Sequence, residues 1–227
     1  MIDWSPARAR PLVTLFGLCA LAVATFGTAA ARRPPDAQVT RRLDASRPIT
    51  YFIAEGAPES GFRASDRALA LLALEAWGRL ADPPLRFEQA SEEAATVRVY
   101  WVTAGTGLYG EMRARTVDSR PAADIFVHPD TDGLGSDIAE RARVDPLFRD
   151  TVVYLTCVHE LGHAFGLPHT SAFADIMYSF QYGGDFVGYF MRFRDRLRSR
   201  ADFSEAPPFS AADARAFDAL YGDVTVR

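Results

Sequence analysis

Short apolar runs alternate with stretches of helical spacing along this chain. Residues 49–53 (Ile-Thr-Tyr-Phe-Ile) form a β-rich run between a proline and a glycine, which predicts a first strand. A helix is expected next, because Ser65 is a plausible N-cap and apolar side chains then recur every three or four residues up to the prolines at 83–84. These apolar positions are Ala68, Leu69, Leu72, Ala76, Trp77 and Leu80.

Further strands are predicted at residues 85–88, 96–102 and 123–128, the second of them with clear alternation of apolar and polar positions. Between the last two, a Gly-rich stretch at 105–110 leads into a short polar and apolar run at 111–115. The acidic, Gly-rich residues that follow the last strand are expected to form a solvated turn.

A central helix is predicted after Asp145, which serves as N-cap and is followed by proline at the first helical position. Its first three turns are apolar nearly all round, as expected of a buried helix. An amphipathic helix follows at 186–197, with aromatic residues on one face and a strongly basic stretch at 192–200. We expect the Arg-rich face to be solvated; attraction of acidic substrates or anionic lipid is the alternative. Residues 210–222 predict a closing helix, with Ser210 as N-cap and a glycine as its stop.

The order of these elements predicts an α+β fold. It would contain about five strands, a central helix and a C-terminal helix. The chain has 227 residues, enough for one good-sized core, and shows no internal repeat. We therefore expect one folded domain at 48–227.

Composition argues against a nucleic-acid partner. The formal net charge is −4 and every one of the 25 basic residues is arginine, yet no Arg cluster has the form of a nucleic-acid motif. We expect no nucleic-acid partner, and we expect a monomer.

The N-terminus predicts a targeting segment. Arg8 and Arg10 precede an uncharged, largely apolar run at 11–31 that ends in an Ala-x-Ala-like sequence. A basic start, an apolar centre and small residues at the end are typical of a signal peptide at 1–31, so a secreted or periplasmic protein is expected. The run is also long enough for a signal anchor, which would tether the domain to a membrane. Residues 32–47 predict a polar extension or short propeptide.

The chemistry of the chain gathers at residues 159–169. His159 and His163 lie four apart, so in a helix they project from one face and can bind one metal ion. Glu160 can reach a water on that ion without being a ligand. Gly166 can adopt positive φ, end the helix and turn the chain so that His169 becomes a third ligand. Three nitrogen ligands leave one zinc position open for water, which indicates a catalytic Zn²⁺ site.

The spacing His-Glu-x-x-His-x-x-Gly-x-x-His, followed by Asp-Ile-Met-Tyr at residues 175–178, resembles the metzincin metallopeptidases and their matrixin-like branch. The resemblance implies a zincin fold, in which the active-site helix lies beneath a mixed, twisted sheet. It implies a protein or peptide substrate and a Met-turn in which Met177 lies beneath the metal without binding it. It also implies that the strand at 107–112 is the sheet edge above the cleft and pairs with an extended substrate. Gly107, Leu108, Tyr109 and Gly110 are then substrate-binding candidates. An ordinary Gly-rich turn and edge strand is an equal alternative.

These features predict a zinc-dependent endopeptidase. The ion would polarise the scissile carbonyl and Glu160 would act as general base. A zinc-bearing, non-catalytic peptide-binding or scaffold protein of the same fold is the rival, and Glu160 argues against it because a binder needs no carboxylate there.

Other metal sites are less well supported. Ca²⁺ could bind the acidic loop at 130–137, although the loop lacks the EF-hand spacing. His128 is the one histidine outside the motif, so the second, structural zinc of animal matrixins is not expected. Residues 32–47 contain no cysteine, so the latency by a propeptide cysteine known among matrixins is not expected either. Cys157 should point away from the metal and lie buried as a free thiol.

Overall fold

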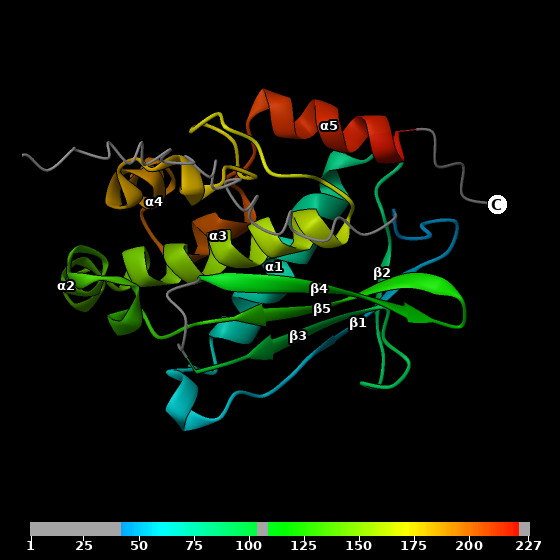
Figure 1. The fold of residues 1–227 in the computed structure, drawn as a ribbon, viewed down its shortest axis with the longest axis horizontal. Coiled ribbons are helices and arrows are strands. Elements are labelled where there is room, and N and C mark those ends of the chain that lie inside the picture. The colour runs from blue at the N-terminus through cyan, green and yellow to red at the C-terminus, as the bar shows by residue number, and fades with distance from the viewer. Residues whose placement is uncertain (1–41, 104–108, 223–227) are drawn as a thin grey trace, which may run out of the picture. The chain divides into compact units, whose positions relative to one another are not determined.

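A five-stranded mixed sheet forms one layer of the computed structural model, which describes residues 42–103 and 109–222 (Figure 1). The strand order is β2-β1-β3-β5-β4. Neighbouring strands are parallel except for β4, which runs antiparallel to β5 and forms one edge. The strands are β1 (Ile49–Ile53), β2 (Phe87–Gln89), β3 (Val97–Trp101), β4 (Gly110–Val117) and β5 (Arg120–Val127). The predicted α+β class and the strand count are confirmed.

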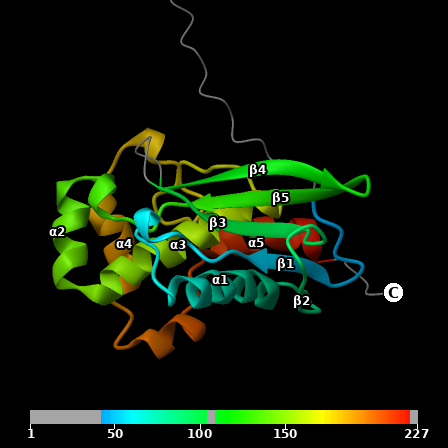
Figure 2. The ribbon, with the colours of Figure 1, turned by 90° about the horizontal axis from the view of Figure 1, so that it is seen from below.

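The helices cover one face of this sheet (Figures 1 and 2). Alternate side chains of β3 and β5 are buried on that face, among them Val97, Val99 and Ile125. Helix α3 lies along β4 and β5, and α1 packs beside α3. The helices are α1 (Asp66–Leu80), α2 (Ser136–Val144), α3 (Pro146–Ala164), α4 (Phe186–Arg194) and α5 (Ala211–Tyr221). Short 3-10 turns are η1 (Pro58–Ser60), η2 (Asp132–Leu134), η3 (Phe180–Tyr182) and η4 (Arg200–Ser204).

The hairpin of β4 and β5 is longer than the sequence pattern indicated. Its turn consists of Asp118 and Ser119, with φ of 49° and 62°, as two-residue hairpin turns require. Pairing then runs from Val117 opposite Arg120 to Gly110 opposite Val127. Since Asp tolerates the left-handed region, this turn needs no glycine and was missed.

Helix α3 begins and ends as predicted. The carboxylate of Asp145 accepts a hydrogen bond from the Phe148 amide at 3.1 Å, and Pro146 occupies the first turn. Gly166 has a φ of 101° and follows the last turn. The Gly166 and Leu167 amides donate back into that turn, a Schellman arrangement that satisfies two terminal carbonyls.

Two helix ends differ from the prediction. Ser65 does not cap α1 through its side chain; instead the Asp66 carboxylate accepts from the Arg63 amide at 2.8 Å. Gly222 ends α5 in the right-handed helical region, with φ of −62°, so the helix end does not use the left-handed conformation that favours glycine. The Ser210 cap is confirmed, because its hydroxyl accepts from two amides of the first turn.

Helix α2 was not predicted. The sequence indicated a solvated turn at 130–137, but residues 132–134 form η2 and a helix begins at Ser136. Its apolar face is only three small or medium side chains wide, at Ile138, Ala139 and Ala142, which is too little for a clear periodic signal.

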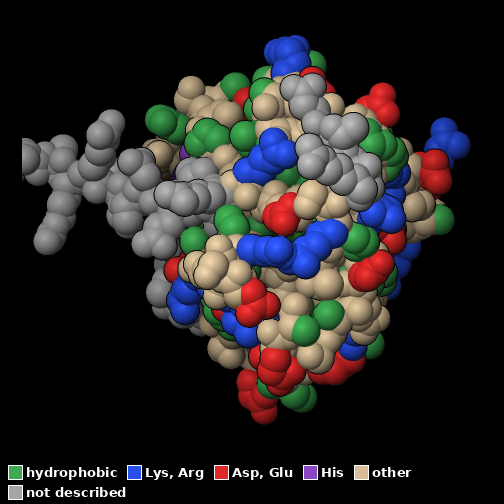
Figure 3. Space-filling model, turned by 90° about the vertical axis from the view of Figure 1, so that its right-hand side faces the viewer, with side chains coloured by type: hydrophobic (Ala, Val, Ile, Leu, Met, Phe, Trp, Pro, Cys, Tyr) green, Lys and Arg blue, Asp and Glu red, His purple; other side chains and the backbone are tan. Residues whose placement is uncertain are grey.

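The Arg-rich segment at 192–200 is not simply a solvated face. Arg194 binds the Asp145 carboxylate at 2.8 Å, and Arg200 binds the buried Asp150 carboxylate at 2.6 Å. Arg196 donates to a loop carbonyl at 2.9 Å. Arg194 and Arg200 therefore attach α4 and η4 to the start of α3, while Arg196 binds the loop before α5. Across the face shown in Figure 3, Arg side chains are likewise interspersed with Asp and Glu.

The predicted targeting segment and most of residues 32–47 lie outside the described residues. The last part of that extension is described: Leu43 is fully buried, and its amide donates to the Tyr221 hydroxyl of α5 at 3.0 Å. Within residues 42–103 and 109–222, no helix combines the length and apolar character that crossing a membrane requires.

A buried ion pair attaches α3 to α1. Arg149 is 1% exposed and donates to the Asp66 carboxylate and to the Pro129 carbonyl, the latter at 3.0 Å. A buried charge is tolerated only when it is paired in this way.

Replacing Arg149 with methionine should lower the free energy of unfolding by about 3–5 kcal/mol, because the Asp66 charge would remain buried without its partner. Urea denaturation measures this change. Arg67→Met is the matched control, since Arg67 pairs with Glu55 at an exposed site, where such a pair is worth about 0–1 kcal/mol. Equal losses in the two variants would contradict the structural role of the buried pair.

Candidate metal centre

Three imidazoles converge at the C-terminal half of α3. His159 and His163 project from adjacent turns of this helix, as their spacing predicted. The Nε2 atom of His169 lies 3.2 Å from that of His159 and 3.1 Å from that of His163. Among the described residues, these three form the one group of three or more His, Cys, Asp or Glu side chains with ligand atoms close enough to share an ion.

The orientation of two rings is fixed by backbone carbonyls. His159 Nδ1 donates to the Ile176 carbonyl at 2.7 Å, and His163 Nδ1 donates to the Leu167 carbonyl at 2.8 Å. With the proton on Nδ1, the Nε2 lone pair of each ring points at the common centre. Metal-binding histidines are commonly oriented by such a second hydrogen bond.

His169 reaches the centre because its loop pairs with the Met-turn, residues 175–178. The Thr170 amide donates to the Met177 carbonyl at 2.8 Å, and the Ser179 amide donates to the Thr170 carbonyl at 3.0 Å. This short parallel bridge between Thr170 and Tyr178 places His169 beside the helix.

The donor set fits zinc. Two imidazole nitrogens at about 2.0–2.1 Å from a tetrahedral Zn²⁺ lie about 3.3 Å apart, close to the distances of 3.1 and 3.2 Å found here. Burial lowers the pKa of His159 to about 3, with a contribution from the neighbouring His163, and burial lowers the pKa of His163 to about 4. Both rings are therefore neutral at pH 7, the form that binds metal.

Met177 packs against the backbone of α3, the helix that carries His159 and His163. The approach is close at Gly162, where a Cβ added to the glycine would lie only 2.3 Å from the Met177 sulfur and 3.0 Å from the Trp77 ring. Any larger residue at 162 would collide with both. Met177 is 1% exposed, so the contact is part of the core.

Glu160 belongs to α3, and its side chain lies against Gly110, the first residue of β4. Burial, and after it the nearby charge of Glu111, raises the pKa of Glu160 to about 8, against the opposing effect of a hydrogen bond from the Met112 amide. Gly110 allows the strand to come this close. A Cβ at that position would lie 2.8 Å from Cγ of Glu160 and 2.8 Å from the methyl group of Thr156.

The substrate-binding candidates fall partly outside the described residues, since Gly107 and Leu108 are not described. Gly110 is the first residue of β4 and lies against Glu160, and Tyr109 directly precedes it. The Tyr109 ring packs 5.3 Å from both Phe180 and Phe190, and thus connects the edge strand to the Met-turn side of the site.

The remaining candidates lie elsewhere. His128 is half-buried at the end of β5, where its amide donates to the Tyr109 carbonyl at 3.0 Å. In the possible calcium loop, Asp130 accepts from the Asp132 amide at 2.9 Å and Asp132 pairs with Arg143 at 3.5 Å. Cys157 is a buried free thiol whose pKa is raised by burial.

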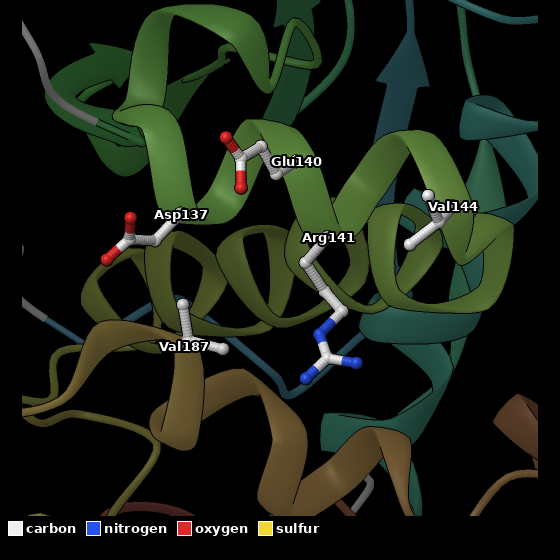
Figure 4. A pocket seen from close by; sticks show the side chains of 5 residues that line it. All are labelled: Asp137, Glu140, Arg141, Val144 and Val187. Atoms are coloured by element: carbon white, nitrogen blue, oxygen red, sulfur yellow. The ribbon is translucent and has the colours of Figure 1, made fainter.

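Two surface hollows lie away from the histidines. One, of about 450 Å³, is lined by Val187 of α4 and four α2 residues, as Figure 4 shows. The other, of about 490 Å³, lies between α1 and the loop that precedes α5.

Sequence reasoning missed the support of the Met-turn by α4 and α5. The Asp213 carboxylate is 2% exposed and accepts from the Ile176 amide at 2.8 Å. The Tyr189 hydroxyl donates to the Ile176 carbonyl at 3.1 Å. A Ser-x-x-Asp capping box at the start of α5 was visible in the sequence, but not the second role of its aspartate.

Comparison with known proteins gives two matches. The family profile of matrixin, peptidase family M10, matches residues 43–185. Interstitial collagenase of Sus scrofa is 29% identical over 141 residues, which cover 60% of this chain and 28% of that protein. The chain thus aligns with little more than a quarter of the length of this curated relative.

Gly162→Ala should destabilise the protein by about 1–3 kcal/mol, because the added methyl group overpacks the contact with Met177. In a Met177→Ala background the same change should cost less, since the contact with the methionine sulfur is then gone, only the contact with the Trp77 ring remains, and alanine favours the helix. Thermal or urea unfolding of the four proteins measures the coupling. Additive effects would show that Gly162 is not needed for the approach of Met177.

Proposed function

Since this chain belongs to the matrixin family, we propose that it is a zinc-dependent endopeptidase. The observation that supports the proposal best is the convergence of three Nε2 atoms at α3, the helix that also carries the buried Glu160. Three protein nitrogens suit a zinc site with one open position, and such sites are catalytic.

His159, His163 and His169 would hold the ion. Bound zinc would supply Lewis acidity toward the scissile carbonyl and lower the pKa of the attacking water. Glu160 takes the proton from that water as general base and gives it to the nitrogen of the leaving amine. A cation at the histidines also favours the charged form of the carboxylate, offsetting the effect of its burial.

The remaining parts of the site position these groups. The Met112 amide hydrogen-bonds the Glu160 carboxylate, and Gly110 leaves room for it. Met177 forms the floor of the site and is not a ligand.

A protein or peptide substrate would bind along β4. This strand ends the sheet, with β5 on one side and no further strand in the described sheet on the other, so its outer edge can pair with an extended peptide. Gly110 lies against Glu160, so a peptide paired with this edge would pass that carboxylate. Tyr109 directly precedes Gly110 in the sequence. Gly107 and Leu108 precede them in the sequence and belong to the same proposed binding strand.

Glu160→Gln should keep stoichiometric zinc and lose peptidase activity by about two to four orders of magnitude, because the amide keeps the shape but cannot accept a proton. His163→Ala should instead lose the metal. Metal analysis and cleavage of a peptide library, each with and without chelator, measure both outcomes. A zinc-loaded parent protein that cleaves nothing would favour the non-catalytic binding protein, and an unimpaired Glu160→Gln would refute the assigned base.

We also propose that the domain acts outside the cytoplasm, secreted or periplasmic, with membrane tethering as the alternative. The basis is the basic, apolar and small-residue order of residues 1–31. N-terminal sequencing of the extracellular or periplasmic protein should give a start near Arg32. An intact Met1 in the membrane fraction would instead identify a signal-anchored enzyme.

A further inference from the structure

The carbonyl of Ile176 lies between two donors from different helices. His159 Nδ1 of α3 donates to it at 2.7 Å, and the Tyr189 hydroxyl of α4 donates to it at 3.1 Å. The same hydroxyl is 3.2 Å from the Asp175 carbonyl. Tyr189 is thus connected to a candidate metal ligand through one shared oxygen atom.

Tyr189 is held firmly in place. Its side chain is 3% exposed, and its ring packs near those of Tyr178 and Phe180, with centroid distances of 6.1 and 5.0 Å. Arg192, also on α4, places its guanidinium 4.4 Å from the centroid of the Tyr189 ring. A ring fixed on several sides delivers its hydroxyl to one position.

The backbone around Ile176 is held from two directions. On one side, Asp213 of α5 accepts from the Ile176 amide at 2.8 Å. On the other, Tyr189 donates to the carbonyls of Asp175 and Ile176. Because each peptide group is planar and rotates as a unit, holding the groups on both sides of the Ile176 Cα restrains the rotation that would turn the Ile176 carbonyl away from His159.

We propose that Tyr189 is a positioning residue for the metal centre, fixing the Ile176 carbonyl that sets the tautomer and ring orientation of His159. The inference rests on the zinc site of the proposed function and adds a role for α4. The matched family segment ends at residue 185, so this residue lies beyond the part of the chain that the family profile describes.

A purely structural tyrosine would behave differently. Its loss would lower the stability of the metal-free protein and leave the affinity for zinc unchanged. Loss of a positioning residue lowers the affinity for zinc itself, because the His159 ring is no longer held in place and must be ordered when the ion binds. Mutation of a group that orients a metal ligand typically lowers the metal affinity about 10- to 100-fold.

The test compares Tyr189→Phe with Tyr221→Phe. Tyr221 is also fully buried, and its hydroxyl donates to the Phe165 carbonyl at 3.1 Å and accepts from the Leu43 amide at 3.0 Å, so its loss removes similar hydrogen bonds away from the Met-turn. Zinc dissociation constants are measured by chelator competition, the visible spectrum after cobalt substitution reports ligand geometry, and melting of the metal-free proteins reports stability.

Tyr189→Phe should raise the zinc dissociation constant about tenfold and alter the cobalt spectrum. Tyr221→Phe should leave both close to those of the parent, although both variants melt earlier. An unchanged dissociation constant in Tyr189→Phe, or an equal rise in both variants, would overturn the proposal. These readouts need no turnover, so a parent protein that binds zinc but cleaves no peptide contradicts the peptidase function alone.

Discussion

The contact between Met177 and the backbone of α3 at Gly162 constrains the whole site. It requires a glycine in the last turn of a buried helix, although alanine is the better helix former. In return, the Met-turn lies against the helix face that carries the histidines. The Ile176 carbonyl can then accept a hydrogen bond from the His159 ring. The Met177 carbonyl can accept one from the amide of Thr170, the residue after His169.

Three separate segments hold the Met-turn in this position. The His169 loop pairs with it through the Thr170 bridge, α5 binds its Ile176 amide through Asp213, and α4 binds its carbonyls through Tyr189. Buried amides and carbonyls need such partners, because an unpaired one is costly to bury. The candidate metal centre is therefore oriented by groups from α3, α4, α5 and the loop between α3 and α4.

The other half of α3 is held by charge. Arg149 and Asp150 are buried near its start and pair with Asp66 and Arg200, which come from α1 and η4. The Arg-rich segment thus has an internal role that composition could not indicate. An arginine run has the same appearance in the sequence whether its partners are water, lipid or aspartates that lie far away in the chain.

The sequence by itself determined what depends on neighbours a few residues apart. Helical spacing puts His159 and His163 on one face, Asp145 and Pro146 begin the helix, and Gly166 ends it with positive φ. Tertiary structure alone decided that Gly110 approaches Glu160, that Asp213 and Tyr189 meet at Ile176, and that polar residues 136–144 form a helix. These contacts join residues with no periodic relation in the sequence, and a short amphipathic segment such as α2 gains its stability from the surface it covers.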